Sequence, residues 1–164
     1  MKAPLCKVCL ESDILCNVCS KRVEEEKITQ IEIKRIKKVY EIVKNNKEFE
    51  NLEIKRILGI NTIYIIVPKG HSKYFFIRNG FLLKKLSSVF KRPVKVVEES
   101  GDKRFFIQKL IQPATLIGLN VLYTPESKKY IVRIPYRERK FVNEKEVSQI
   151  LSFLLPGELE IKFE

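Results

Sequence analysis

The chain of 164 residues is long enough for one ordinary domain or two small ones, and its 45% hydrophobic content excludes wholesale disorder. With 32 Lys and Arg against 20 Asp and Glu, the formal net charge is +12, which favours a polyanionic partner such as nucleic acid. The apolar runs are too short to cross a bilayer, and cysteines and charges stand where a signal peptide has its apolar stretch. We therefore expect a cytoplasmic protein without a membrane partner.

All four cysteines lie near the N-terminus as two C-x-x-C pairs, Cys6 with Cys9 and Cys16 with Cys19. Each pair can fold into a turn that aims two thiolates at one ion, and two such turns complete a tetrahedral zinc site with four cysteine ligands. A reducing compartment disfavours disulfides, and a redox C-x-x-C motif would need only one pair. The sequence thus predicts one structural Zn²⁺ in a knuckle-like clip, whose order depends on the metal and whose four thiolates leave no position open for catalysis.

A charged connector, residues 21–27, precedes a helix with a well-marked start. Thr29 and Glu32 form a T-x-x-E capping box, after which apolar residues recur at helical spacing. The runs 52–58 and 62–67 are rich in β-branched residues and are separated by a glycine-containing turn. They predict an antiparallel hairpin.

The segment 73–99 predicts a helical turn, a tight turn at residues 77–80, a second helix and a strand at 93–98. A similar order of elements follows it in the chain. Asp102 caps a helix that Pro113 ends, and Asn143 caps a later one. The remaining predicted elements are strands at 116–123 and 130–134 around a turn at 124–127, a short helical turn at 135–141, and a last strand at 159–163. This repeat of roughly sixty residues indicates two copies of one small α/β unit.

Helix, short glycine turn, helix and strand resembles the nucleic-acid-gripping part of a KH domain, where a G-x-x-G loop lets the RNA or DNA backbone approach the main chain. The whole chain resembles the archaeal NusA-like proteins, which are transcription elongation and termination factors built from two tandem type II KH domains. It resembles more closely their relatives with an N-terminal four-cysteine zinc clip. The resemblance implies an α+β fold with a zinc clip and connector over 1–27, one KH-like domain over 28–100 and another over 101–164. Each domain would have the order αββααβ and a degenerate G-x-x-G loop.

Both loops depart from the family pattern. Gly80 matches the second glycine of the first loop, but Ile77 stands where the first glycine belongs, and glycine there permits unusual backbone angles and close approach of nucleic acid. Arg78 fits one variable position. The second loop has no such motif and carries Glu144 and Glu146, whose carboxylates should repel phosphate. We therefore expect the second copy to be structural or to use another surface.

The candidate nucleic-acid contacts are basic side chains and turn residues, with affinity supplied chiefly by phosphate contacts. They are Lys73, Arg78, Asn79, Gly80, Lys84, Lys85, Lys91, Arg92, Arg133 and Arg137. The same basic clusters include Lys95, Arg139 and Lys140. The candidates for stacking on unpaired bases are Tyr74, Tyr130 and Tyr136. The aromatic residues assigned to the core are Phe75, Phe76, Phe81 and Phe90.

No nucleophile motif, phosphate loop or carboxylate pair accompanies the single histidine, His71, which we interpret as an incidental surface residue. We expect a protein that is not an enzyme and has no small-molecule substrate. The leading hypothesis, implied by the resemblance, is an RNA-binding protein recruited to transcripts or the transcription machinery. The alternative is a factor associated with the ribosome or RNA polymerase, whose degenerate KH domains contact protein or structured ribosomal RNA. Ile77 and the acidic second loop favour the alternative, and the basic surface fits both.

Overall fold

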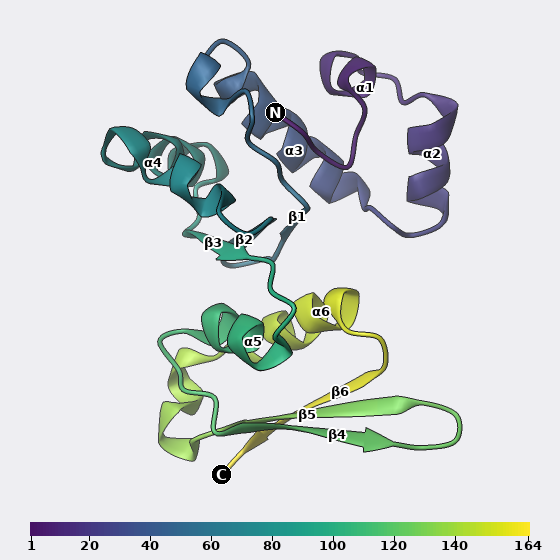
Figure 1. Ribbon diagram of the computed structural model, residues 1–164, viewed down its shortest axis with the longest axis vertical. Coiled ribbons are helices and arrows are strands. Elements are labelled where there is room, and N and C mark those ends of the chain that lie inside the picture. The colour runs from purple at the N-terminus through teal and green to yellow at the C-terminus, as the bar shows by residue number, and fades with distance from the viewer. The chain divides into compact units, whose positions relative to one another are not determined.

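The computed structural model describes all 164 residues, and the chain divides into two compact units (Figure 1). Unit 1 comprises residues 1–58 and 62–99, and unit 2 comprises residues 59–61 and 100–164. Each unit combines helices with one three-stranded sheet, so the predicted α+β class is confirmed. None of the helices combines the length and the apolar character needed to cross a membrane.

Unit 1 begins with three α-helices and continues with short 3₁₀ helices, written η, around the strands of its sheet. Its elements are α1 (Lys7–Glu11), α2 (Asn17–Glu24), α3 (Gln30–Val43), η1 (Lys47–Phe49), β1 (Arg56–Leu58), β2 (Ile63–Val67), η2 (His71–Phe75), α4 (Ile77–Phe90) and β3 (Val94–Glu98). The helix α2 corrects one prediction, because residues 21–24 were expected to form a connector. Cys16 caps this helix at its start, and Lys21 and Arg22 lie in its last turn, where cations are favoured.

The predicted hairpin of unit 1 is confirmed, because β1 and β2 pair antiparallel. The third strand, β3, pairs parallel with β2. The strand β1 is shorter than the predicted run 52–58 because residues before it pair elsewhere. Lys2 donates its N–H to the Leu52 carbonyl at 2.7 Å and accepts the Ile54 N–H at 2.9 Å, while the Glu53 N–H donates to His71, so this segment bonds partners other than β2.

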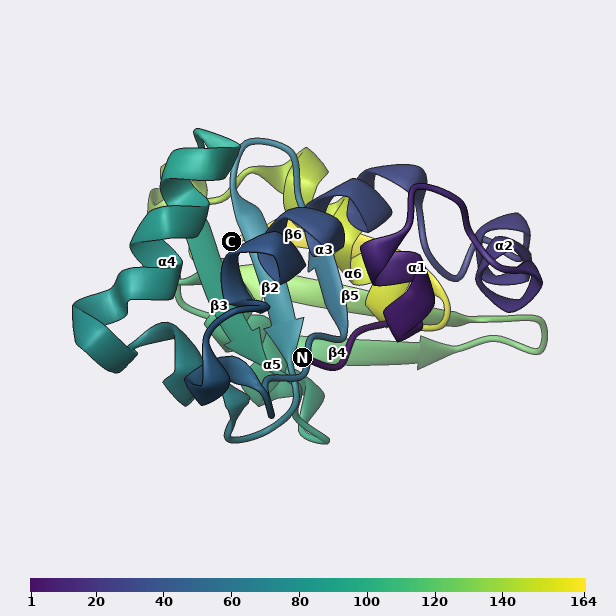
Figure 2. The same ribbon diagram turned by 90° about the horizontal axis from the view of Figure 1, so that it is seen from above.

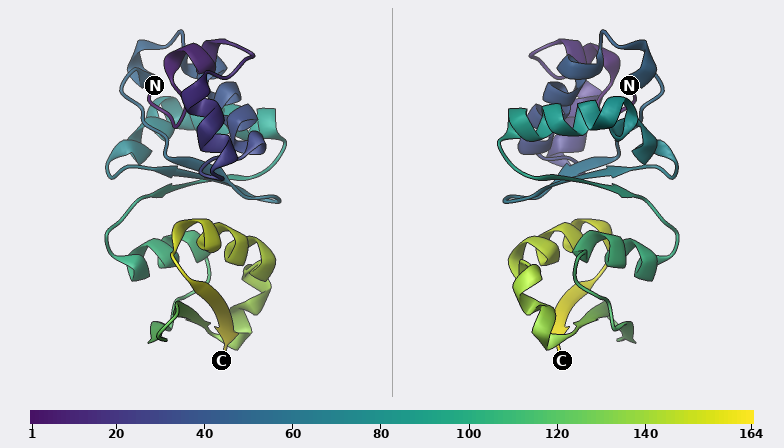
Figure 3. Two further views of the ribbon diagram at one scale, coloured as in Figure 1. Left: turned by 90° about the vertical axis from the view of Figure 1, so that its right-hand side faces the viewer. Right: turned by 90° about the vertical axis from the view of Figure 1, so that its left-hand side faces the viewer.

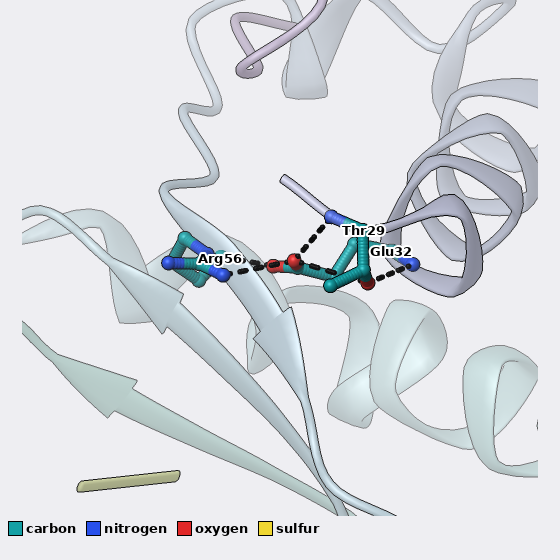
Figure 4. A network of polar contacts seen from close by, with 3 residues as sticks. All are labelled: Thr29, Glu32 and Arg56. Atoms are coloured by element: carbon teal, nitrogen blue, oxygen red, sulfur yellow. Dashed lines mark hydrogen bonds and ion pairs between the residues drawn. The ribbon is translucent and has the colours of Figure 1, made fainter. Parts of the chain in front are cut away.

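The capping box at the start of α3 is confirmed and is also a link to the sheet (Figure 4). Thr29 Oγ1 accepts the Glu32 N–H at 3.2 Å, and Glu32 Oε2 accepts the Thr29 N–H at 3.0 Å. Arg56 of β1 donates from Nε and Nη2 to the two oxygens of the same carboxylate, at 2.7 and 2.9 Å. Since Glu32 is only 2% exposed, this carboxylate is a buried group satisfied by a cap and by a two-point ion pair.

The helices α3 and α4 lie over the same face of the unit 1 sheet (Figures 2 and 3). They contribute buried side chains such as Ile36, Leu82 and Leu86 to one apolar cluster, which also includes Phe75 at the end of η2. Phe75 therefore lies in the core as predicted. Phe76 does not, because it is 62% exposed at the junction of η2 with α4. Phe81 and Phe90 are partly buried against the cluster.

Unit 2 repeats the strand order and strand directions of unit 1. Its elements are α5 (Lys103–Ile111), β4 (Gly118–Tyr123), β5 (Lys128–Ile134), η3 (Tyr136–Phe141), α6 (Glu144–Leu154) and β6 (Glu158–Phe163). The strands β4 and β5 are antiparallel, and β6 is parallel to β5. The predicted caps are confirmed, since Asp102 accepts from the Arg104 N–H at 2.9 Å and Asn143 from the Glu146 N–H at 3.2 Å.

Two side chains of unit 2 are buried where the sequence interpretation placed them at the surface. Tyr130 is 1% exposed and its hydroxyl accepts from Lys103 Nζ at 3.0 Å, so this ring cannot stack on a base. Glu146 is 4% exposed. Its Oε1 accepts the N–H groups of Ile60 and Asn61, which belong to unit 2, at 2.7 and 3.0 Å. The expected repulsion of phosphate by Glu146 is therefore wrong, because its charge is turned inward and hydrogen bonded.

Candidate metal centre and basic turn

The two C-x-x-C pairs adopt the same local structure. Cys6 is the N-cap of α1 and Cys16 the N-cap of α2, while Cys9 and Cys19 lie three residues on, in the first turn of each helix. Side chains at the N-cap and at the third helical position lie close together, as in an ordinary capping box. The sequence spacing therefore becomes two helix starts that aim four sulfurs at one point.

The four sulfurs lie within 4.8 Å of one another, and the cysteines form no disulfide. The Sγ atoms of Cys6 and Cys16 are 3.9 Å apart. A tetrahedral ion with thiolate bonds of about 2.3 Å needs sulfurs about 3.8 Å apart, so this arrangement can hold a metal ion with small adjustments. Cys9 and Cys19 are buried, whereas Cys6 is exposed, so the cluster lies at the edge of unit 1 with its inner half in the core.

Backbone N–H groups orient the sulfurs and divide the thiols into two kinds. The Cys19 N–H donates to Cys16 Sγ at 3.5 Å, which stabilises the thiolate and lowers the pKa of Cys16 to about 6. Cys9 Sγ accepts the Cys16 N–H at 3.1 Å, a contact that by itself lowers the pKa of Cys9. Burial and the neighbouring thiols outweigh it and raise that pKa to about 12. A metal ion would bind the Cys16 thiolate readily and would have to displace the proton of Cys9.

The clip, residues 1–24, is packed onto α3 rather than carried as a separate arm. Tyr40 of α3 donates its hydroxyl proton to Glu11 at 2.6 Å, and Lys37 donates to the Ser12 carbonyl at 2.6 Å. Arg22 donates to the Pro4 carbonyl across the clip. Since Cys9 and Cys19 also belong to the apolar cluster of unit 1, the four-cysteine cluster and the core of that unit share side chains.

The predicted tight turn is present as three consecutive residues in the left-handed region. Their φ and ψ angles are 52° and 46° at Arg78, 55° and 38° at Asn79, and 74° and 31° at Gly80. Left-handed backbone costs roughly 1–2 kcal/mol for a residue with a side chain, and less for glycine and asparagine. The turn lies at the start of α4, directly after Ile77, and leaves the side chains of Arg78 and Asn79 exposed.

Glu48 of η1 contacts this turn, and sequence reasoning did not find it. Its Oε1 lies 2.8 Å from Arg78 Nη2, although the geometry falls short of a hydrogen bond and leaves that buried oxygen without one. The two residues are 30 positions apart, and no spacing rule connects them. The Arg78 guanidinium is therefore already attracted by a carboxylate of its own chain.

The other predicted contacts of unit 1 lie along the chain on either side of the turn. Lys73 is in η2, Lys84 and Lys85 are in α4, and Lys91 and Arg92 follow α4. All five are exposed. Lys73, Lys84, Lys85 and Lys91 form no ion pair, so their charges are available to an external anion.

Acidic residues are absent from a long stretch around the turn, a signal that was present in the sequence and was missed. Residues 54–97 contain ten Lys and Arg and no Asp or Glu. Unit 1 as a whole has 21 Lys and Arg against 12 Asp and Glu, for a net charge of +9, whereas unit 2 has 11 against 8, for +3. Most of the positive charge of the protein thus belongs to unit 1.

The two predicted nucleic-acid contacts of unit 2, Arg133 and Arg137, differ in whether their charge is paired. Arg133 donates from Nε and Nη2 to both oxygens of Glu164, at 3.0 and 2.7 Å, so its charge is paired within the sheet. Arg137 lies in η3 with its side chain 86% exposed, and the neighbouring Tyr136 is 64% exposed. 

His71 is not the incidental residue that was expected. Its Nδ1 accepts the Glu53 N–H at 3.1 Å and ties η2 to the segment before β1. The single histidine thus has a structural role in unit 1.

The chain matches no protein-family model and no curated protein sequence. Its fold recurs in solved structures, of which 62 chains match. One of them, titled "Crystal structure of APE1850", is 20% identical in sequence, with a TM-score of 0.60 over 82% of this chain and 100% of that chain. At this identity the likeness establishes a shared fold and nothing about activity or partners.

Proposed function

We propose that the protein is an RNA-binding module of the NusA-like, tandem KH type, with a structural zinc ion in its N-terminal clip. It binds RNA through the turn at residues 77–80 and the exposed lysines beside it. It acts by binding and is not an enzyme.

The observation that carries this proposal is the left-handed turn within a stretch free of carboxylates. Three left-handed residues in succession leave Asn79 exposed and Gly80 half-buried, so a phosphate can approach the Asn79 backbone closely, whereas the Gly80 N–H donates to the Phe76 carbonyl at 3.2 Å. The exposed lysines in η2 and α4 add positive charge on both sides of that backbone. The order of elements and the mixed sheet of each unit support a KH-like assignment.

The donor set supports zinc as the ion of the clip. Four thiolates suit a soft, tetrahedral ion, and a closed set of four cysteine ligands is typical of structural zinc. Such an ion would be held by Cys6, Cys9, Cys16 and Cys19, and it would replace the thiol protons by bonds that link α1 to α2. Its role would be to keep these two short helices folded against α3.

A second candidate function is a factor that contacts a protein or structured RNA of the ribosome or RNA polymerase. The observation in its favour is the Arg78–Glu48 ion pair, which occupies the one arginine of the turn. Together with Ile77 at the first glycine position, this ion pair leaves fewer groups of the turn able to bind a free single strand of RNA.

The test is a salt series of binding measurements with single-stranded RNA, duplex RNA and duplex DNA. For single-stranded RNA, we expect the double variant Lys84→Ala and Lys85→Ala to weaken binding roughly tenfold. The slope of log K against log salt concentration should fall in magnitude by about 1.4, since each lost phosphate contact removes about 0.7. The control is Lys34→Ala with Lys145→Ala, which removes the same charge from exposed positions outside the turn. Equal losses for the two double variants would sink the assignment of the turn as the binding surface.

Replacing Glu48 by Gln distinguishes the two candidates further. If RNA phosphate competes with this carboxylate for Arg78, Glu48→Gln strengthens RNA binding a few-fold at low salt, because the guanidinium no longer has a competing anion. If the ion pair is part of a protein-binding surface, the same change leaves RNA binding unaltered and weakens co-purification with ribosome or polymerase.

A further inference from the structure

The 3₁₀ helix η3 of unit 2 is held in place by its backbone and by its single acidic side chain. The Tyr136 N–H donates to the Glu164 carbonyl at 2.6 Å, which fixes the start of η3 to the end of β6. Glu138 turns toward the body of the unit, where its Oε2 accepts the Thr115 N–H at 2.6 Å. The element is therefore anchored at two points before any ligand arrives.

The remaining five side chains of η3 are exposed, and they are aromatic or basic. They are Tyr136, Arg137, Arg139, Lys140 and Phe141. Residues three apart lie above one another in a 3₁₀ helix, so Arg137 and Lys140 share one face and Tyr136 and Arg139 another. The third face holds Glu138, which already bonds inward, and Phe141, whose side chain is 51% exposed. One short element thus displays two rings and three cations.

The cations of η3 have no strong carboxylate partner to hold them. Arg137 Nε lies 4.0 Å from Glu138 Oε1, at the limit of an ion pair, and its side chain is 86% exposed. Arg139 packs its guanidinium 5.4 Å from the Phe163 ring, and Lys140 holds its amine 5.1 Å from the Phe141 ring. A cation beside an exposed ring is the arrangement that suits a nucleotide, whose base stacks while its phosphate pairs with the charge.

We propose that η3 is a single-strand binding site, on which unpaired bases stack against Tyr136 and Phe141 while Arg137 and Lys140 contact the adjoining phosphates. This site rests on the proposed function, because its ligand is also RNA. It differs in lying in unit 2 and in binding RNA by stacking of bases, whereas the turn of unit 1 binds phosphate close to its backbone. Stacking needs a base with a free face, so the site discriminates single strands from duplexes and tolerates any base.

The first experiment introduces a fluorophore at the site. The chain has no Trp, so Tyr136→Trp makes indole emission report on η3 alone. On titration with a short uridylate oligomer, we expect the emission to be quenched and to saturate, and a duplex RNA of equal length to leave it unchanged. Emission that stays constant while the oligomer is seen to bind by another method would overturn the proposal.

The second experiment removes the rings without the fluorophore. We expect Tyr136→Ala with Phe141→Ala to weaken oligomer binding roughly tenfold and to leave the salt slope unchanged, because stacking releases no counterions. The matched control is Tyr123→Ala on the β4–β5 hairpin, which removes a ring that is 74% exposed and also lies beside a cation, Lys128, but outside η3. Tyr136→Leu keeps apolar bulk, and its partial loss of affinity separates stacking from simple apolar contact. Unchanged melting of each variant establishes that the fold is intact.

The outcomes separate this inference from the proposed function. Binding that needs Lys84 and Lys85 but ignores Tyr136 and Phe141 overturns the η3 site and leaves the turn as the binding surface. Binding that needs the two rings but ignores the two lysines supports the η3 site and rejects the turn. Absence of binding to any RNA rejects both.

Discussion

Units 1 and 2 share an order of elements and a pattern of strand pairing, but they differ at the connection between the 3₁₀ helix and the helix that follows. In unit 1 the connection is the left-handed turn at 78–80. In unit 2 it is Val142 in extended conformation followed by Asn143, whose side chain caps α6. The sheet and its covering helices thus set the topology, while a few local residues decide what the connection displays at the surface.

The anchoring of the 3₁₀ helices differs in the same way. In unit 1, η2 is tied to the end of β3 through side chains, since the Ser72 hydroxyl donates to Glu98 Oε1 at 2.5 Å. In unit 2, η3 is tied to the end of β6 through backbone atoms of Tyr136 and Glu164. Unit 1 also carries the four-cysteine clip, to which unit 2 has no equivalent element. Unit 1 should therefore respond to a bound metal ion where unit 2 does not.

Removal of the proposed zinc ion should have the largest effect, and that effect should be confined to unit 1. Structural zinc ions held by cysteines contribute apparent binding free energies of order 10 kcal/mol, and without one the helices α1 and α2 bury too little to stay folded. We expect a chelator to abolish amide protection over residues 7–24 and to leave the strands of unit 2 protected. Hydrogen exchange followed by mass spectrometry measures both, and continued protection of α2 in chelator would contradict the clip.

The bidentate ion pairs Arg56–Glu32 of unit 1 and Arg133–Glu164 of unit 2 should contribute very differently to the free energy of unfolding. Glu32→Ala should lower the free energy of unfolding of unit 1 by about 4 kcal/mol, because it breaks a buried ion pair and a helix cap together. Glu164→Ala removes a pair of similar geometry whose side chains are about one third exposed, and the melting temperature should hardly move. Denaturant titration of both variants is the measurement, and similar losses would show that burial does not separate the two pairs.

Glycine-to-alanine changes should destabilise unit 2 more than unit 1, which is the reverse of the order expected for the two ion pairs. At Gly157 the φ angle is 132° and an added Cβ would overlap the Lys128 carbonyl, so Gly157→Ala should cost about 3 kcal/mol. At Gly80 the φ angle is 74° and an added Cβ would meet nothing nearer than the Phe75 carbonyl oxygen at 3.8 Å. Gly80→Ala should therefore cost only about 1 kcal/mol, which is the cost of left-handed backbone alone. Thermal unfolding distinguishes the two.

A small and pH-dependent effect is expected for the hydrogen bond between Ser72 and Glu98. The Ser72 hydroxyl lowers the pKa of Glu98 below its ordinary value, so the bond stabilises the fold above the pKa of the unfolded chain. That stabilisation disappears as pH falls through the folded pKa. We expect Ser72→Ala to cost about 1 kcal/mol at neutral pH and almost nothing well below about pH 4, where the carboxyl is protonated in both states. A cost that is the same at both pH values would argue against a charge-assisted bond.

Much of the local structure followed from the sequence because its causes are local. The capping box at Thr29, the caps at Asp102 and Asn143 and the glycine turn at the start of α4 each depend on residues within a few positions of one another. The spacing of the cysteines likewise predicted their cluster, since C-x-x-C places two sulfurs on one helix start. Patterns of this kind can be interpreted without knowledge of the rest of the chain.

The sequence by itself determined which segments form helices and strands, that four cysteines gather, and that the charge is strongly positive. Only the tertiary structure decided which polar groups are buried, or are hydrogen bonded or ion paired within the chain. Glu48 reaches Arg78 from 30 positions away, Glu146 bonds two backbone N–H groups, and Tyr130 is buried although it lies among basic residues. The physical reason is that burial and pairing depend on contacts between distant segments, which composition and periodicity do not encode.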